Sequence, residues 1–154
     1  MENPRSVSTD TWVISLPGDW VEKESTEYGA LNFESADGAK AMYITTWELP
    51  DGEGPRMPKE LAESFKNKSV EALHDMEGYS WQLVDDVAGQ TGATAVVLVD
   101  HLAEANGYRI VTKILARPPV VVRASFHDYL CEDYEISREF FAPVVHSLRL
   151  REAV

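Results

Sequence analysis

Apolar and polar residues alternate along three segments in the first third of the chain, with the period of half-buried β-strands. The first segment is 12–16 (WVISL), and a short polar arm precedes it. The other two, 31–33 and 41–47, flank a turn signal at Asp37-Gly38 and together predict a β-hairpin. The chain therefore opens with strands.

A helix is predicted from Pro58 to Met76, because the apolar residues of this segment recur at helical spacing. Pro58 suits the first position of a helix, where no backbone N–H is needed, and Gly78 stops the helix. One face of this helix is expected to pack on a sheet. The residues expected on that face are Leu61, Ala62, Phe65, Ala72, Leu73 and Met76, with Ser69 among them.

A second helix is predicted within 132–150 (EDYEISREFFAPVVHSLRL) near the end of the chain. Either Asp133 or Ser137 can cap its start. Pro143 removes one helical hydrogen bond, so a kink or a break is expected near Phe140. The apolar residues at helical spacing are Ile136, Phe140, Val144 and Leu148.

Four strands are predicted between the two helices. The segment 81–87 (WQLVDDV) is followed by a turn at 89–92 (GQTG), and two long strands flank Asn106-Gly107. Asn-Gly is the strongest short-range signal for a two-residue type I′ turn, which would place Ala105 opposite Tyr108. The cross-strand pairs expected from this register are Val97–Ala116, Val99–Ile114, Asp100–Lys113 and Glu104–Arg109.

A polar face is predicted across the last three of these strands. After a turn at Pro118-Pro119, the segment 120–126 continues the apolar face, and its other side continues the polar face. Such a face can be a solvated, ion-paired surface, as is common in antiparallel sheets. It can equally bind a protein, because flat charged surfaces suit protein partners better than small substrates. The residues expected there are Asp100, Glu104, Arg109, Lys113, Arg123 and His127, with Ser125.

The segment 48–58 (ELPDGEGPRMP) concentrates proline, glycine and acid and predicts a long exposed loop. Glu48, Asp51 and Glu53 make it a candidate binding site for a protein with a basic surface, since long irregular loops are often functional. Trp47 borders the loop. It is either an exposed interface anchor or a core residue, which is the commoner place for tryptophan.

Composition narrows the class of protein. The 154 residues have the size of one compact domain, so a single domain over 1–154 is expected. A formal charge of -12 disfavours nucleic acid and favours basic partners. No apolar stretch approaches the roughly 18–20 residues that span a bilayer, and the start has no signal-peptide pattern. Since the lone Cys131 cannot form an internal disulfide, these features predict a cytoplasmic protein that is not integral to a membrane.

The sequence does not indicate a catalytic, metal or cofactor site. His74, His101, His127 and His146 do not have the close spacing of zinc ligands, so no metal or cofactor is predicted. Cys131 and His127 could act as nucleophile and base, but no oxyanion-hole signal accompanies them. A lone cysteine is more often a packed apolar residue. We therefore predict that the protein is not an enzyme.

The order of these elements and two motifs resemble the Mog/PsbP-like superfamily, which includes DcrB-like and type VI effector-chaperone-like proteins. The resemblance implies an α+β fold in which helices flank an antiparallel sheet as an α/β/α sandwich, with a tryptophan folded back onto the sheet. It also implies mostly non-enzymatic work, such as binding a GTPase, assisting photosystem assembly or acting as a chaperone for secreted effectors. The residues that carry it, in LPGDW and FFAPVVHSLRL, are Leu16, Pro17, Trp20, Phe141, Ser147 and Leu148.

Two hypotheses about function follow. The first is a non-catalytic protein-binding module, such as a bacterial secretion-associated chaperone, an immunity protein or an adaptor, with a partner that has a basic surface. The alternative is a small-ligand-binding protein or an enzyme with a site around the polar sheet face. A pocket that gathers His127, Cys131 and a carboxylate would favour the alternative.

Overall fold

The computed structural model of the chain describes residues 3–152. A large antiparallel sheet has seven strands in the order β3-β4-β5-β9-β8-β7-β6, and a small sheet has the order β1-β2-β10. The elements, in chain order, are β1 (Arg5–Ser8), β2 (Trp12–Leu16), β3 (Val21–Lys23), β4 (Ala30–Glu34), β5 (Lys40–Glu48), α1 (Pro58–His74), β6 (Gln82–Thr91), β7 (Thr94–Ala103), a 3₁₀ turn (Glu104–Asn106), β8 (Tyr108–Arg117), β9 (Val120–Asp128), α2 (Tyr134–Ser147) and β10 (Arg149–Leu150).

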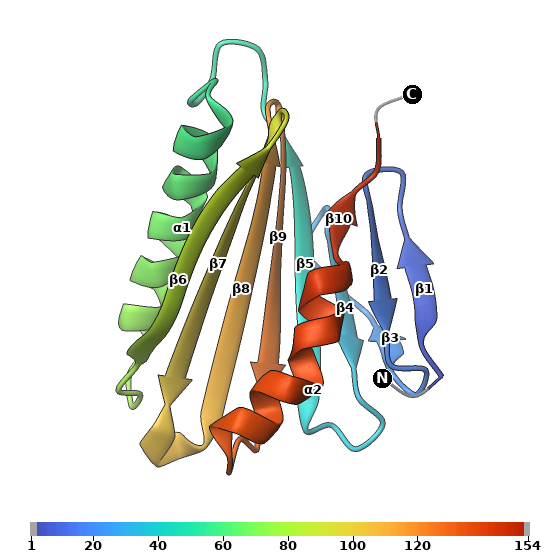
Figure 1. Cartoon of the computed structure of the whole chain (residues 1–154), viewed down its shortest axis with the longest axis vertical. Helices are drawn as coiled ribbons and strands as arrows, with labels where there is room; N and C mark the ends of the chain where they lie inside the picture. The colour runs from blue at the N-terminus through green and yellow to red at the C-terminus, as the bar shows by residue number, and fades with distance from the viewer. Residues whose placement is uncertain (1–2, 153–154) are drawn as a thin grey trace.

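The large sheet lies between two layers, which confirms the predicted α+β fold. Helix α2 crosses one face beside the small sheet, and α1 lies along the other face next to β6 (Figure 1). Neither α1 nor α2, the helices of the described residues, has the length and apolar composition needed to cross a membrane. The core under α2 includes Trp12, Ile14, Leu16, Trp20, Phe33, Phe126, Phe141 and Leu148, and the core under α1 includes Leu61, Ala62, Val97, Val99, Ile114 and Val121.

The LPGDW corner turns the chain from β2 of the small sheet into β3 of the large one. Trp20 is 1% exposed and meets the ring of Phe141 edge-on, with centroids 6.4 Å apart. A Cβ at Gly18 would lie 2.3 Å from the Asn3 carbonyl oxygen, so only glycine fits this crossing. As the resemblance implies, the motif buries its tryptophan between sheet and helix.

The serine of the closing motif ties α2 to β2. The Ser147 hydroxyl accepts a hydrogen bond from the Ser15 N–H at 2.9 Å and donates one to the Val144 carbonyl oxygen at 2.7 Å. Leu148, which follows it, is 1% exposed. Both motifs of the resemblance therefore hold the small sheet against α2.

The hairpin between β7 and β8 has a different register from the predicted one. Ala103, not Ala105, lies opposite Tyr108. The cause is the turn: Glu104–Asn106 forms a 3₁₀ turn, and Gly107 ends it with a φ of 60°. A shift of two residues keeps each side chain on its face, so the hydrophobic pattern is the same in both registers. The pairs that replace the predicted ones are Val97–Ile114, Leu98–Lys113, Val99–Thr112 and Leu102–Arg109.

The predicted polar face across three strands is also wrong. The turn at Pro118-Pro119 pairs Arg117 with Val120, so that Ile114 lies beside Arg123. Since helices cover both faces of these strands, apolar residues occur on both, and composition does not separate the faces. Asp100, Arg109 and Lys113 lie on the α2 side, whereas Arg123, Ser125 and His127 lie on the α1 side.

The helices begin where they were predicted, and α1 buries residues of its predicted face. Pro58 is the first residue of α1, and Asp133 caps α2 by accepting a hydrogen bond from the Ile136 N–H. The latter helix continues undivided through Pro143. Ile136 is 68% exposed and Phe140 39% exposed, so the predicted stripe of α2 is wrong at these two positions, whereas Val144 and Leu148 are buried as predicted. The residues that α2 buries are Ser137, Phe141, Val144 and Val145, and those that α1 buries are Leu61, Ala62 and Leu73.

Strand β1 was not predicted, and β6 is longer than predicted. The polar arm forms β1, which pairs with β2. Strand β6 continues through the predicted turn at 89–92 as far as Thr91, and the chain reverses at Gly92-Ala93. As a result β6 is a ten-residue strand at one edge of the large sheet.

Candidate functional site

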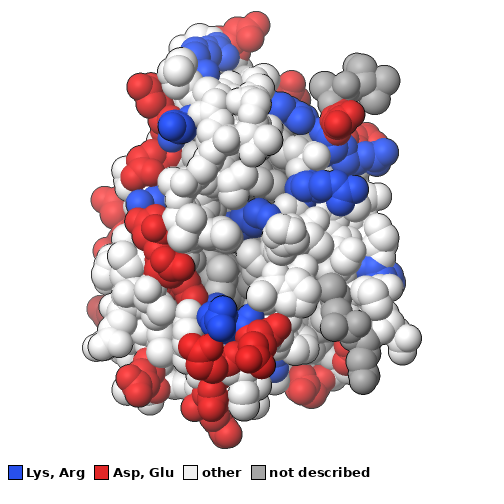
Figure 2. Space-filling model, viewed as in Figure 1, with Lys and Arg blue, Asp and Glu red and all other residues white. Residues whose placement is uncertain are grey.

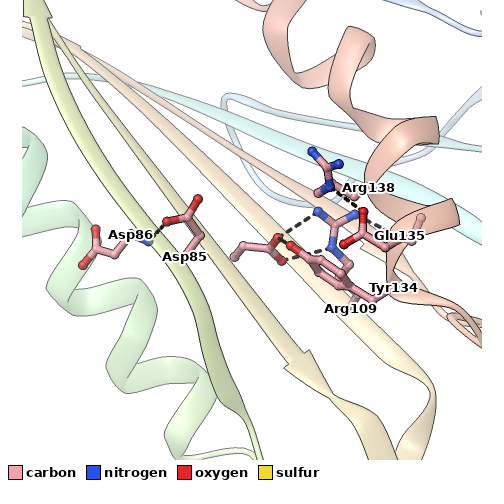
Figure 3. Close-up of polar contacts among 8 residues, drawn as sticks. Asp85, Asp86, Arg109, Tyr134, Glu135 and Arg138 are labelled. Atoms are coloured by element: carbon pink, nitrogen blue, oxygen red, sulfur yellow. Dashed lines mark hydrogen bonds and ion pairs between the residues drawn. The ribbon is translucent and has the colours of Figure 1, made fainter.

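A buried ion pair under α2 contains two residues of the predicted polar face. Arg109 donates from Nε to Asp100 Oδ1 at 3.0 Å and from Nη2 to Oδ2 at 2.9 Å, and its third nitrogen reaches Ser137 at 3.0 Å. The Tyr134 hydroxyl adds a 2.7 Å bond to the same carboxylate (Figure 3). Asp100 and Arg109 are 8% and 4% exposed. They hold α2 on the sheet, and little of either side chain reaches solvent.

Lys113 holds the other end of α2. Its ammonium donates to the carbonyl oxygens of Val145 and Leu148 at 2.8 and 2.7 Å. A cation is favourable there, because the C-terminus of a helix carries a partial negative charge. Burial nevertheless lowers the pKa of Lys113 to about 8. At 7% exposure, Lys113 therefore acts as a cap at the C-terminus of α2.

Arg123 and His127 lie on the opposite face, together with an aromatic cluster. His127 Nδ1 shares a hydrogen bond with the Tyr108 hydroxyl, and its Nε2 shares one with Ser125 at 3.0 Å. The rings of Tyr43, Tyr108 and Tyr129 pack around His127 with centroids 4.9 to 5.7 Å away. Burial lowers the pKa of His127 to about 4. The imidazole is therefore neutral at pH 7.

Because His127 is buried and neutral, we expect the folded protein to lose stability in acid. The unfolded chain binds a proton below the ordinary pKa of 6.5, which the folded protein does not bind until about 4, so stability falls as the pH drops through this interval. Between pH 7 and 4.5, His127 should account for roughly 2–3 kcal/mol of lost stability. His127→Gln should remove that part of the loss in urea unfolding at the two pH values. The same change at the exposed His146 is the control, and equal losses in both variants would contradict the prediction.

The hypothesis of a Cys131 nucleophile with His127 as its base finds no support in the geometry. Both ring nitrogens of His127 are engaged by Tyr108 and Ser125. Cys131 is 8% exposed, and burial raises the pKa of its thiol. A polar hollow of about 360 Å³ beside Arg123 and Tyr43 includes neither His127 nor Cys131. The pocket that would favour an enzyme is not formed by these residues.

The acidic loop is exposed as predicted, whereas Trp47 is not a free anchor. Glu48, Asp51 and Glu53 are all exposed, and Glu104 is exposed at the β7–β8 turn. Trp47 is half-buried between the ring of Phe65, 5.0 Å away, and the guanidinium of Arg123, also 5.0 Å away. Its ring packs between α1 and the sheet. A protein that binds the loop would therefore meet acidic side chains there but no exposed aromatic ring from Trp47.

The edge strand β6 was not among the candidate sites predicted from the sequence. All ten of its residues are exposed, and in the described part of the chain it pairs only with β7. Leu83, Val84 and Val87 are 58%, 43% and 51% exposed. The run LVDDV within it combines apolar and acidic residues without alternation, a pattern that could have indicated a strand that no helix covers.

Grooves flank β6 on both sides of the sheet. The groove toward α2 has a volume of about 480 Å³. Two hollows toward α1 have volumes of about 590 and 570 Å³. Figure 2 shows the groove toward α2 as a hollow with acidic side chains on the side of α1 and β6 and basic side chains at other points of its margin. Its lining combines apolar residues with the charged residues Asp85, Asp100, Arg109, Lys113 and Arg138. Each volume is within the range of ligand pockets, so the edge is open to side chains from either face.

The acidic pair on β6 points to opposite grooves. Asp85 lies on the α2 side and Asp86 on the α1 side (Figure 3). Lys66 of α1 donates to Asp86 at 2.6 Å and to Glu63 at 3.3 Å. Within residues 3–152, Asp85 forms no ion pair, and its carboxylate accepts only the neighbouring Asp86 N–H. The edge therefore presents an unpaired negative charge beside exposed backbone.

Comparisons with known proteins show the fold. No family model matches the chain, and no curated protein sequence matches it. The solution structure of the cyanobacterial PsbP protein CyanoP from Synechocystis sp. PCC 6803 is similar with a TM-score of 0.68 at 10% identity, over 97% of this chain and 92% of that chain. PA94, a protein of unknown function from Pseudomonas aeruginosa, is similar with a TM-score of 0.51 at 9% identity, over 98% and 99%. The chain therefore has a PsbP-like fold.

Proposed function

We propose that the protein is a non-catalytic protein-binding module that takes an extended segment of its partner as an additional strand beside β6. The observation that carries this proposal is the run of ten exposed residues on a strand with one paired side. The free side of such a strand presents backbone N–H and C=O groups to another chain. Main-chain hydrogen bonds would supply affinity, and the flanking grooves would supply specificity.

The two edges of the large sheet differ in a way that supports this choice. The other edge strand, β3, has only three residues, and short edge strands are a common protection against unwanted pairing. Strand β6 contains neither proline nor lysine, the residues that most often block an edge. Its irregularity is confined to the shift in register between Leu83 and Asp85. The segment from Asp86 to Thr91 is regular and available.

The finer roles implied by the resemblance, a secretion-associated chaperone, an immunity protein or an adaptor, belong to this class. Each requires a stable surface that recognises one segment of another protein. The acidic loop of Glu48, Asp51 and Glu53 remains a second candidate surface, because it is exposed and carries negative charge. It would act through charge alone, and its contribution would fall with salt.

Site-specific photo-crosslinking in the source organism tests the proposal. A photoreactive amino acid at Val87, which is 51% exposed on β6, should form a covalent adduct with the partner. The same residue at Asp51 reports on the loop, and at Tyr43 on the sheet face beside Arg123. Placed at the fully exposed Tyr28, it is the control for non-specific reaction.

The expected result is an adduct from Val87 that is absent from Tyr28. Denaturing electrophoresis and mass spectrometry of the adduct identify both the partner and the segment in contact. An adduct from Asp51 or Tyr43 without one from Val87 would place the partner elsewhere and refute binding at β6.

A further inference from the structure

We propose that the segment bound at β6 has alternating apolar and basic side chains, apolar toward α2 and basic toward α1. This inference rests on the proposed function, binding of an extended segment at β6, and specifies the partner. Successive side chains of a strand point to opposite faces of its sheet. An added strand therefore sends alternate side chains into the two sides of the edge, and the chemistry of each side selects its own residues.

The side toward α2 selects apolar residues. Val87 and Leu98, which pair across β6 and β7, line this groove together with Val111. Its buried charges are already compensated, because Arg109 pairs with Asp100 and the Lys113 ammonium binds helix carbonyls. At the rim, Arg138 pairs with Glu135 at 3.0 Å (Figure 3). Asp85 also lies on this side and forms no ion pair within residues 3–152, so a basic side chain could pair with it there. Beside Val87, a charged side chain entering the groove would lose water without gaining a partner, whereas an apolar one gains burial. The preference for apolar residues on this side therefore applies to the positions beside Val87.

The side toward α1 selects basic residues with long apolar stems. Its floor is apolar, with Leu83, Ala88, Ala95, Val97 and Val99, while its rim carries more acids than bases. Lysine and arginine fit such a site, since their stems cover apolar surface while their charges reach the rim. Lys66 compensates only two of the acids, Glu63 and Asp86. The rim acids are Glu60, Glu63, Glu71, Asp75 and Asp86, and the rim bases are Lys59 and Lys66.

The same charges oppose pairing with a second copy of this chain. Asp85 and Asp86 lie near the middle of β6, so a symmetric antiparallel pair of β6 strands would bring four carboxylates together. Like charges on neighbouring strands destabilise pairing. The edge is thereby protected from self-association while it remains open to a basic strand, and the overall charge of -12 acts in the same direction.

Synthetic ten-residue peptides with blocked ends test the inference directly. The first peptide alternates valine and lysine, the second has the same residues as one block of each, and the third alternates valine and glutamate. Affinities come from calorimetry, and the site comes from NMR contacts to the β6 backbone. The alternating Val-Lys peptide should bind at β6 at least about tenfold more tightly than the other two, a difference of roughly 1.4 kcal/mol.

Two variants assign the contribution of each side. Glu60→Gln with Glu71→Gln should weaken the Val-Lys peptide and lower the salt dependence of its affinity, because both acids lie on the α1 side. Val87→Asp should weaken it by placing a charge in the apolar groove. Asp10→Asn with Glu22→Gln removes two exposed acids away from β6, one between β1 and β2 and one on β3 at the opposite edge of the large sheet. This pair is the matched control and should leave affinity unchanged.

The possible failures are distinguishable from failure of the proposed function. Equal binding of the block and alternating peptides at β6 would overturn the pattern but retain strand addition at this edge. If a natural partner crosslinks through Val87 but the Val-Lys peptide does not bind, the alternating pattern is overturned while strand addition at β6 is retained. Peptide contacts at the loop, or a dimer joined through β6 in ultracentrifugation, would overturn the inference by identifying a different site or a second copy as the occupant.

Discussion

Asp100→Ala should lower the free energy of unfolding by about 3–5 kcal/mol, the cost of removing one partner of a buried ion pair. Arg109 would keep its charge at 4% exposure with only Ser137 as a side-chain hydrogen-bond partner, and the Tyr134 hydroxyl would lose its acceptor. Urea unfolding followed by circular dichroism measures the change. Because Arg109 and Tyr134 connect β8 with α2, the variant should also loosen this helix.

Two controls separate the ion pair from general damage to the sheet. Asp85→Ala changes the residue that lies opposite Asp100 on the exposed strand β6, and its effect should be within about 0.5 kcal/mol. The double variant Asp100→Leu with Arg109→Met removes both charges and should recover at least half of the loss. If the double variant were as unstable as Asp100→Ala, the uncompensated charge would not be the cause.

Trp20→Ala should lower the free energy of unfolding by about 3–5 kcal/mol through loss of a large side chain from the core. Its ring is 1% exposed and contacts Phe141 at the junction of α2 with the sheets. Since the LPGDW corner places it there, the effect measures what the motif contributes to the fold. Denaturant unfolding with an unchanged slope against urea would show that stability, and not compactness of the unfolded chain, has changed.

Trp47→Ala is the matched control, because the same side chain is removed from a half-buried site. It contacts Phe65 and Arg123 at the surface of α1 and leaves no enclosed cavity. We expect a loss smaller than that of Trp20→Ala by at least about 1.5 kcal/mol. Equal losses would show that Trp20 of the corner motif contributes no more to stability than a half-buried tryptophan does.

The buried ion pair and the proposed site are connected through α2. Arg109 and Tyr134 set the position of this helix, and the helix forms one wall of the groove beside β6. Variants of the ion pair are therefore unsuited to test binding, since they would change the groove itself. For that reason the binding tests use exposed residues on β6, on α1 and in the acidic loop.

Local signals in the sequence determined both helices, the longer strands and several of their ends. The alternation of Trp12, Ile14 and Leu16 identified a strand whose apolar side is fully buried, because a strand turns every second residue to the same face. Pro58 marked the start of α1, and Asp133 was one of two candidates for the cap of α2. These features depend on a few neighbouring residues, so they are readable without the fold.

The tertiary structure decided the register of the β7–β8 hairpin and the face on which each polar residue lies. Two registers that differ by two residues bury the same side chains, so the choice depended on the 3₁₀ turn before Gly107. Asp100, Arg109 and Lys113 looked like a solvated face because lysine, arginine and aspartate are rarely buried. Helix α2 supplies the hydroxyls and carbonyls that make their burial possible.

The order of strands in the sheet decided where the candidate site lies. The local sequence of β6 does not indicate that it pairs with a single strand, because its place at the edge depends on the order of all strands in the sheet. The grooves beside it depend on how far α1 and α2 extend over the sheet. The sequence by itself determined an acidic α+β chain and where its two helices begin, while the open edge arose from long-range pairing, which local propensity does not encode.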